Sequence, residues 1–352
     1  MERLINIKKF FHKKKILITG NTGFIGSWLT IVLLRYNSEI TGVSKNKNNK
    51  YNMFKLFNLE NKIKYFQFDL SNVNKTKKFL KKNTFNIIIH LAAEPLIIDG
   101  LKNPNQIIKN NFLSTLNLIN NIKNKKTLLV NFTTDKVYSN KNTKKKFKED
   151  DFLNGDDPYS YSKVCVDMLT KMWTKNFYNF KCINIRCGNV IGGGDWNKKR
   201  LIPDLVKSIY ENKKLTLRNL NSTRPWIFIL ELCNLMLLLI KKKYKSKKVY
   251  DEFNICPNNH NQKNIKWILK FFEINIKRKI NYRYKKEFNE KIFLQLNNTK
   301  IKKYLKLNYR INDIKRFKET FDWYYMFYNE KNNLYLKVKK CLKNFEKVFF
   351  KI

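Results

Sequence analysis

The sequence predicts a doubly wound α/β fold, in which a parallel sheet is followed by a smaller C-terminal region. Two observations carry this prediction: short apolar runs alternate with longer helix-compatible stretches as far as about residue 190, and the alternation then becomes irregular. Nearly continuous apolar runs are typical of parallel strands, because helices cover both faces of such a sheet. Strands that alternate with helices favour the doubly wound arrangement, whose ligands bind beyond the carboxyl ends of the strands.

The elements are expected in a regular order. Apolar runs predict strands at residues 15–19, 39–43, 64–68, 86–91, 127–133 and 182–187. Stretches with helical periodicity predict helices between them at residues 24–36, 73–82, 105–123 and 159–177. Further helices are expected near 203–212 and 230–243, and the basic, partly apolar residues 330–352 predict an appended helix.

The composition is strongly basic, with 73 Lys and Arg against 27 Asp and Glu and a formal net charge of +46. Taken alone, this excess favours a protein that binds nucleic acid or an anionic surface. The charge is nevertheless spread along all 352 residues, whereas a dedicated nucleic-acid segment gathers it into one arm. Lys, Asn, Ile, Phe and Tyr are all abundant and have A/T-rich codons, so genome composition explains the charge better. No specific nucleic-acid partner is expected.

The remaining totals exclude other classes. With 43% hydrophobic residues the chain buries a large core, and six Cys without a CxxC pair predict reduced thiols and no metal site. The longest apolar run, residues 227–240, is interrupted by Glu231 and Asn234 and is too short to span a bilayer. The basic N-terminus lacks the apolar segment of a secretory signal. A cytoplasmic protein without membrane association is expected.

A glycine-rich turn, residues 20–26 (GNTGFIG), stands directly after the first predicted strand and opens the first predicted helix. Glycines let the backbone approach a pyrophosphate, which the amide groups and the dipole of the helix N-terminus then bind. This strand–turn–helix context favours a Rossmann dinucleotide-binding site over an ordinary tight turn. The second strand ends without the acidic residue that often holds the ribose of NAD. Lys45 follows it, and because a basic residue suits the 2′-phosphate of NADP, the chemistry of this position alone slightly favours NADP.

Tyr159 and Lys163 form the second motif, and their spacing of four residues places them on one face of a helix. A lysine ammonium lowers the pKa of a neighbouring phenol, so that a tyrosinate can take a hydroxyl proton while hydride leaves for a nicotinamide. Tyr161 is a competing phenol, but Cys165 stands where it would need a lysine. An exposed Tyr–Lys pair without function is the alternative.

The third motif, Thr134-Asp135-Lys136, ends the fifth predicted strand, where side chains point towards a bound nicotinamide. Hydride transfer alone does not need an acid at this position. A protonated Asp135 can donate a proton to a leaving hydroxyl group, whereas a capping role in the turn is the alternative.

The fourth motif is residues 186–196 (RCGNVIGGGDW), followed by residues 200–205 (RLIPDL) and 223–226 (TRPW). Its three consecutive glycines suggest a backbone that closes over a ligand. Arg218 and Arg224 supply guanidinium groups suited to a diphosphate. Trp196 and Trp226 fit a buried structural role and a ligand contact equally well.

These motifs resemble a known family. The GxxGxxG spacing resembles that of the extended short-chain dehydrogenase/reductases, and residues 20–29, 133–138, 149–163, 186–196, 200–205 and 223–226 resemble the CDP-glucose 4,6-dehydratases within the sugar-nucleotide dehydratase/epimerase branch. The Asp-Lys pair at 135–136 is the sharper marker, since the related dTDP-glucose enzymes carry Asp-Glu. The resemblance covers about residues 10–325, with departures at Asn21, Ile25, Glu94, Ser114 and Phe228.

The resemblance implies NAD as the cofactor and a residue set for each part of the site. It implies a Rossmann domain in residues 10–190, a nucleotide-sugar-binding region in 191–328, interleaved with the last sheet elements, and a basic extension in 329–352. The implied catalytic residues are Tyr159, Lys163, Thr134, Asp135 and Lys136. Cofactor contacts are implied for Gly20, Thr22, Gly23, Phe24, Ile25, Gly26, Asp69, Leu70, Leu91, Ala92, Ala93, Asn111, Tyr159 and Lys163, and substrate contacts for Asn189, Arg200, Leu201, Arg218 and Arg224.

The implied reaction is the dehydration of CDP-D-glucose to CDP-4-dehydro-6-deoxy-D-glucose, by oxidation at C4, loss of water across C5–C6 and return of hydride to C6. The C5 base is open between a neutral Lys136 and a proton relay through Tyr159. A sugar-nucleotide 4-epimerase is the nearer alternative, and a nucleic-acid-binding protein with a vestigial Rossmann core is the alternative from another class. A homo-oligomer is expected.

Overall fold

A computed structural model describes residues 2–45, 51–95, 97–177, 179–257, 263–285, 291–307 and 311–350. Its centre is a seven-stranded sheet whose strands are all parallel, in the order β11-β7-β5-β4-β1-β2-β3. The strands are β1 (Lys15–Thr19), β2 (Glu39–Ser44), β3 (Lys64–Gln67), β4 (Ile87–His90), β5 (Leu128–Thr134), β7 (Lys181–Cys187) and β11 (Tyr250–Ile255). The doubly wound α/β fold is confirmed, and its strand order reverses between β1 and β4, where ligands of such sheets bind.

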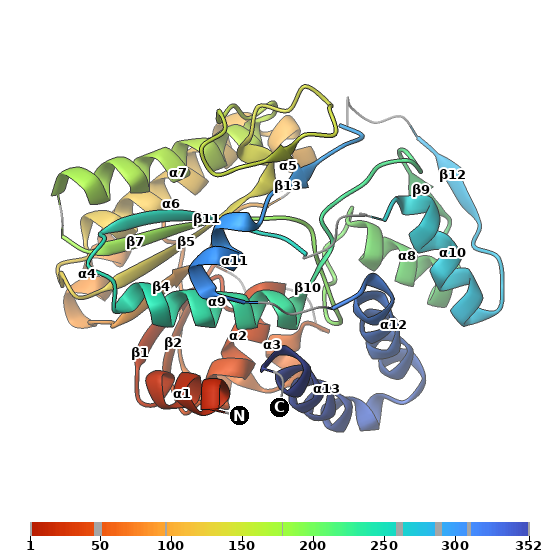
Figure 1. Cartoon of the computed structure of the whole chain (residues 1–352), viewed down its shortest axis with the longest axis horizontal. Helices are drawn as coiled ribbons and strands as arrows, with labels where there is room; N and C mark the ends of the chain where they lie inside the picture. Colours follow the sequence, from red (N-terminus) through yellow and green to blue (C-terminus); the bar gives the residue numbers. More distant parts are fainter. Residues whose placement is uncertain are drawn as a thin grey trace.

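Helices cover both faces of the sheet (Figure 1). On one face lie α4 (Val73–Lys82), α6 (Pro104–Asn120) and α7 (Pro158–Phe177), and on the other lie α1 (Glu2–Phe11), α2 (Phe24–Leu34) and α9 (Ile229–Tyr244). Successive side chains of β1 point to opposite faces of the sheet. Ile16 and Ile18 lie in the core under α2 and α9, whereas Leu17 lies in the core under α4 and α6. The apolar runs in the sequence reflect this double burial.

The smaller region lies beyond the carboxyl ends of the strands and is irregular, as expected. It contains β8 (Val190–Ile191), α8 (Leu201–Tyr210), β9 (Leu215–Leu217), β10 (Ile227–Phe228), α10 (Ile265–Ile276), β12 (Tyr282–Tyr284) and α12 (Asp313–Asn329). After β13 (Gln295–Leu296) the chain returns to the sheet, where α11 (Thr299–Leu305) packs against β11 and α9. Short parallel pairs join β8 to β10, β9 to β12, and β13 to β6 (Lys146–Phe147) of the preceding loop. The domain boundaries inferred from the resemblance stay predictions.

Single turns and the termini complete the fold. The short helices are α3 (Met53–Leu56), α5 (Ile97–Lys102), η1 (Leu59–Lys62), η2 (Asp135–Val137) and η3 (Lys331–Asn333). The appended helix expected in residues 330–352 is α13 (Leu334–Phe350), which packs beside α1, so the two termini lie close together (Figure 1). Within the described ranges, no helix has the length and apolar character needed to cross a membrane.

Candidate active site

A cavity of about 1290 Å³ lies at the carboxyl ends of the central strands, bordered by the smaller region. Every residue predicted from the sequence to contact cofactor or substrate, or to take part in catalysis, lines this cavity. They are Gly20, Thr22, Gly23, Phe24, Ile25, Gly26, Asp69, Leu70, Leu91, Ala92, Ala93, Asn111, Thr134, Asp135, Lys136, Tyr159, Lys163, Asn189, Arg200, Leu201, Arg218 and Arg224. The fold therefore brings together residues that are up to about two hundred positions apart, while the role of each stays a prediction.

The glycine-rich turn forms one end of the cavity. Gly20 adopts a left-handed conformation (φ 72°), and a Cβ atom there would lie 2.9 Å from the backbone nitrogen of Ala92. A Cβ atom on Gly26 would collide with the carbonyl oxygen of Gly20. Helix α2 starts directly after Gly23, whose position carries no side-chain cap, so the first amide groups of the helix face the cavity end without a competing acceptor. This cradle fits the pyrophosphate of a dinucleotide.

Lys45 lines the same cavity as this cradle but is paired with two carboxylates. Its Nζ atom lies 3.1 Å from Oδ2 of Asp69 and 3.8 Å from Oε1 of Glu94. The hydrogen bond and charge of Asp69 raise the pKa of Lys45 despite partial burial, so the ammonium persists within a group of net negative charge. Such a group repels a 2′-phosphate. The slight lean to NADP drawn from Lys45 alone is therefore wrong.

Tyr159 and Lys163 both reach the cavity from the first half of α7, whereas Tyr161 lies outside it with half of its surface exposed. Lys163 Nζ donates a hydrogen bond of 2.9 Å to the carbonyl oxygen of Phe132. Burial lowers the pKa of Lys163 to about 8 against the opposing field of Asp167. Burial raises the pKa of Tyr159 to about 12, and the charge of Arg200 and a hydrogen bond with Thr134 oppose this rise.

Asp135 is a buried acid beside this pair, with 2% of its surface exposed. The Thr134 hydroxyl donates to its Oδ1 atom at 3.0 Å, whereas its Oδ2 atom has no hydrogen-bond partner within the described residues. Burial raises the pKa of Asp135, although the charges of Lys136 and Arg224 and the bond from Thr134 oppose the shift. The geometry suits a carboxylic acid that keeps its proton and donates it to a ligand.

The opposite end of the cavity carries the residues expected to bind substrate. Arg200 Nη1 lies 3.4 Å from Oδ2 of Asp195, and Leu201 begins α8 next to it. Asn189 accepts a backbone hydrogen bond of 2.9 Å from Ile227. Arg218 is half-buried at the end of β9, with its side chain at the cavity wall.

Arg224 is more deeply buried than a simple phosphate ligand requires. Its guanidinium donates to the carbonyl oxygens of Thr223, Lys291 and Ile292 at 2.8, 2.8 and 3.0 Å. Asp156 pairs with Lys291 at 3.2 Å from the other side of the cavity. Arg224 therefore anchors the 291–292 backbone while its positive charge acts on Asp135.

Two glycines of the run Gly192–Gly194 have a packing reason that the sequence did not suggest, whereas Gly192 lines the cavity. A Cβ atom on Gly193 would collide with the ring of Trp323, and one on Gly194, at φ 83°, with the side chain of Met53. Trp196 is buried against Trp323 and other aromatic rings of α12 and does not line the cavity. Close packing against α12 thus explains Gly193, packing against α3 together with a left-handed backbone explains Gly194, and Trp196 is structural.

The departures from the family pattern divide between core and cavity. Asn21 is fully buried under the glycine turn and accepts a hydrogen bond of 2.8 Å from Ser44. Phe228 packs against Phe345 of α13, with ring centroids 4.9 Å apart. Glu94, in contrast, lines the cavity beside Lys45. Only Glu94 of these three changes the chemistry that a bound cofactor would meet.

Sequence reasoning missed several residues of the cavity. Asp157 caps the start of α7 by accepting from the Ser160 amide at 3.0 Å, and a negative charge beside Tyr159 in the sequence was a usable signal. Asp195 stands inside the fourth motif but was given no role, and the others on the wall come from the smaller region and had no local signal: Asn197, Lys199, Arg283, Lys285 and Lys291. Arg283 and Lys285 depend on the short pair of β9 and β12, and the rest lie in loops, which carry little pattern.

Comparisons with known proteins agree with this arrangement. Residues 16–256 match the model of the NAD dependent epimerase/dehydratase family. The chain is 29% identical to CDP-glucose 4,6-dehydratase of Salmonella typhimurium over 273 residues, which cover 74% of this chain and 76% of that protein. It is 25% identical to UDP-glucose 4-epimerase of Mycoplasma genitalium, with 69% and 76% covered.

Solved structures show the same fold. The dTDP-glucose 4,6-dehydratase of Bacillus anthracis in complex with NAD superposes with a TM-score of 0.75 at 23% identity, over 90% of this chain and 98% of that one. UDP-glucuronic acid 4-epimerase of Bacillus cereus gives 0.77 at 21%, over 89% and 100%. With the family model matching more than half of its length, the chain belongs to the NAD-dependent epimerase/dehydratase family, and its cofactor is NAD.

Proposed function

We propose that the protein is a hydro-lyase that dehydrates CDP-D-glucose to CDP-4-dehydro-6-deoxy-D-glucose. The observation that carries the proposal is the buried Asp135 carboxyl, whose Oδ2 atom is unpartnered among the described residues and which shares one cavity with Tyr159 and Lys163. Hydride transfer uses the Tyr–Lys pair, and elimination of water needs an additional acid. The similarity to the Salmonella typhimurium enzyme supports CDP-glucose as the substrate.

Tyr159 takes the proton of the sugar O4 hydroxyl in the first step. Thr134, which is hydrogen-bonded to Tyr159, orients that hydroxyl, and the ammonium of Lys163 stabilises the tyrosinate. The cradle of Gly20 to Gly26 would hold NAD, which would supply the hydride acceptor for C4 and the hydride donor for C6. Because burial raises the pKa of free Tyr159 to about 12, a positive charge close to the phenol is required for this step at neutral pH.

Asp135 protonates the departing O6 hydroxyl in the second step, and its raised pKa keeps the proton available. The C4 ketone makes the C5 proton acidic, so a weak base is sufficient to remove it. Lys136 lines the cavity and serves as this base if it is neutral, whereas Tyr159 serves if the proton passes through it.

The second candidate function is a sugar-nucleotide 4-epimerase. The similarity to UDP-glucose 4-epimerase of Mycoplasma genitalium favours it, and it needs the same Tyr159 and Lys163. Epimerisation oxidises and re-reduces C4 without loss of water, so no leaving hydroxyl group needs a proton from Asp135. We therefore place dehydration first.

Incubation of the protein with NAD and CDP-glucose tests the proposal. A dehydratase gives a product lighter by one water, whereas an epimerase gives a CDP-hexose of unchanged mass; mass spectrometry and sugar analysis separate the two. Tyr159→Phe removes the proton acceptor and is expected to lower kcat by about 10²–10⁴-fold in either case. Parallel reactions with dTDP- and UDP-glucose test the base preference. Inertness towards every nucleotide sugar would contradict both functions.

We also propose a homo-oligomer, formed through α7. Tyr161, Met168 and Met172 lie along one side of this helix with 50%, 57% and 45% of their surfaces exposed, although the chain carries a net charge of +46. An uncharged strip is the surface on which two such basic copies repel each other least. Sedimentation of the Met168→Glu, Met172→Glu double variant should show a smaller species than the parent chain, and an unchanged mass would contradict this. The cytoplasmic location stays a prediction.

A further inference from the structure

A buried ion pair lies behind the Tyr–Lys pair, between α7 and the sheet. Asp167 of α7 and Arg186 of β7 have 0% and 1% of their surfaces exposed. Arg186 donates to both carboxylate oxygens, from Nη2 to Oδ1 at 2.8 Å and from Nε to Oδ2 at 3.0 Å. A paired and fully hydrogen-bonded geometry of this kind fixes both side chains, because breaking it leaves an uncompensated charge in the core.

The same two residues connect the segments that carry the proposed catalytic groups. The Thr133 hydroxyl, next to Thr134 on β5, donates to Oδ2 of Asp167 at 3.1 Å. Arg186 Nη1 donates to the Tyr138 hydroxyl at 3.1 Å, and Tyr138 directly follows η2, which holds Asp135 and Lys136. The pair therefore joins α7, the end of β5 and η2 to one another.

Asp167 also supplies the negative charge nearest to Lys163 along the helix. The two residues are four positions apart and lie on one face of α7. His90 of β4 is buried near Lys163 and stays neutral, because burial and then the charge of Lys163 lower its pKa to about 3. The charges of Asp135 and Arg200 act on Tyr159, at the cavity. Arg186 contacts Asp167 on the side away from the cavity. Burial lowers the pKa of Lys163, and the negative charge of the Asp167 carboxylate opposes this change.

We propose that Asp167 and Arg186 are positioning residues for the hydride-transfer step: together they hold α7 in register with the Thr134–Lys136 segment, and Asp167 keeps Lys163 in its ammonium form. Neither residue lines the cavity or is expected to touch the substrate. The inference rests on the proposed Tyr–Lys chemistry, but not on CDP-glucose as the substrate.

Asp167→Asn is the direct test: the asparagine oxygen still accepts from Thr133 and Arg186 Nε, while the charge and the hydrogen bond from Arg186 Nη2 are removed. Loss of the charge destabilises the Lys163 ammonium, so the alkaline limb of the kcat–pH profile should move to lower pH by about one unit. At pH 8 this corresponds to a roughly five-fold lower kcat for a group that titrates near that pH. Asp167→Glu restores the charge and should return the limb towards its original position.

Glu231→Gln provides a matched control elsewhere in the molecule. Glu231 of α9 and Arg316 of α12 form another fully buried pair, with bonds of 2.7 and 3.0 Å, and neither lines the cavity. Both substitutions should lower Tm, but only Asp167→Asn should move the pH profile. An Asp167→Asn enzyme with the parent profile and a lower Tm would overturn the proposal, since Asp167 would then be merely structural.

The wild-type reaction separates this inference from the proposed function. If the parent enzyme converts another nucleotide sugar instead of CDP-glucose, the profiles are measured with that substrate. If it converts none, the titration of Lys163 is followed in the NAD complex by NMR of ¹³Cε-labelled lysine, assigned by its loss in Lys163→Arg. A Lys163 titration at lower pH in Asp167→Asn supports the pair, and an unchanged one overturns it.

Discussion

The proposed roles of single cavity residues depend on their protonation states, which burial changes. Asp135 Oδ2 has no hydrogen-bond partner within the described ranges, and the carboxyl pKa is raised, so the group is ready to donate a proton. The same loss of solvation lowers the pKa of Lys163 and raises the pKa of Tyr159, because burial disfavours the charged form of each group. The roles of acid and base thus follow from burial and from which opposite charge lies nearest.

Asp135→Asn is expected to abolish formation of the dehydrated sugar while leaving C4 chemistry in place. Asparagine fills the same space and accepts the Thr134 hydrogen bond, but it has no acidic proton for O6. Kcat for water loss should fall by about 10²-fold or more. Mass spectrometry of the nucleotide sugar measures the loss of water, and NAD affinity serves as the control. Full activity in this variant would show that another group protonates O6.

His90 makes stability sensitive to acid. Its ring is fully buried between the hydroxyls of Thr19 (2.8 Å) and Thr115 (3.0 Å), and burial, assisted by the charge of Lys163, lowers its pKa to about 3 from 6.5. Between these two values the unfolded chain binds a proton that the folded chain does not. The free energy of unfolding therefore falls by about 1.4 kcal/mol for each pH unit below about 6.5, until about pH 3.

The measurement is urea unfolding at pH 7 and pH 5, with His90→Gln as the comparison. Gln cannot titrate, so the loss of stability between the two pH values should be smaller in the variant by about 2 kcal/mol. Other titrating groups are common to both chains and cancel in this difference. Equal losses in the two chains would contradict a neutral, buried His90.

Whole elements show a similar dependence on a few buried contacts, and α13 is the clearest case. Glu346 is the single acidic residue of this helix, and its carboxylate accepts from Arg35 Nη2 and from the Tyr36 hydroxyl, each at 3.2 Å. Glu346→Ala leaves the buried Tyr36 hydroxyl without this partner and should cost about 2 kcal/mol of unfolding free energy. Thermal unfolding measures this, with Lys347→Ala as an exposed control. Because α13 does not line the cavity, kcat should be unchanged.

The sequence predicts most elements because double burial leaves long apolar runs. Six sheet strands, four helices of the first half and α13 lie where the pattern places them. Strand β11 was missed since it carries Asp251 and Glu252, whose charges pair with Lys243, Lys248 and Lys300 and conceal the apolar alternation. Helix α1 was missed because it has only ten residues, and its apolar positions alternate with charged and polar ones.

The same limit applies within the site. The expected residues all line the cavity, and most of them lie at strand ends or in the first turn of a helix, where a short motif fixes the position. The reason for Gly193, which packs on Trp323, and the pairing of Lys45 with Asp69 and Glu94 involve segments distant in sequence. Asp167 and Arg186 are nineteen positions apart, and neither carries a signal that names the other.

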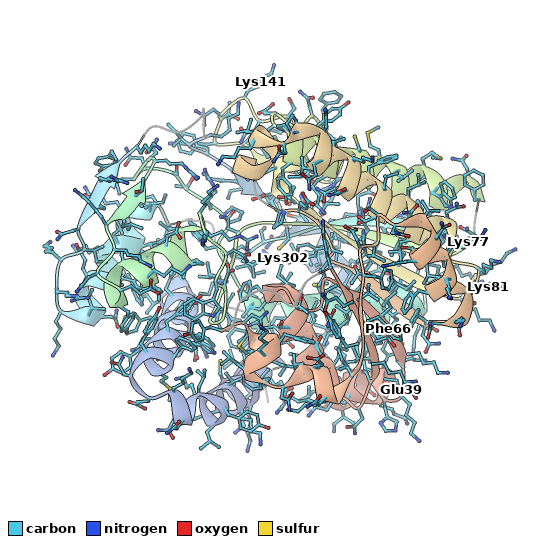
Figure 2. The ribbon with its side chains drawn as sticks, turned by 180° about the vertical axis from the view of Figure 1, so that it is seen from behind. Glu39, Phe66, Lys77, Lys81, Lys141 and Lys302 are labelled. Atoms are coloured by element: carbon cyan, nitrogen blue, oxygen red, sulfur yellow. The ribbon has the colours of Figure 1, made fainter. Side chains whose placement is uncertain are left out.

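The whole molecule carries its positive charge largely on exposed lysines. Lys77 and Lys81 of α4 and Lys141 of the loop after β5 project from the periphery (Figure 2). A field of this kind attracts any polyanion, so weak binding to DNA that is lost with added salt is expected. Because this binding does not involve the cavity, it should persist in Tyr159→Phe and does not argue for a nucleic-acid function.

The same field should act on the substrate, because a nucleotide diphosphate sugar is an anion. We expect kcat/KM for CDP-glucose to fall as salt rises, while kcat stays constant, since the Debye length shrinks from about 30 Å at 0.01 M to about 8 Å at 0.15 M. Steady-state kinetics across this range measure the effect. Lys77→Glu with Lys81→Glu lowers the net charge without altering the cavity wall, and should weaken the salt dependence. If instead only Arg218→Ala weakens it, the attraction comes from the cavity cations, and the peripheral charge has no part in substrate capture.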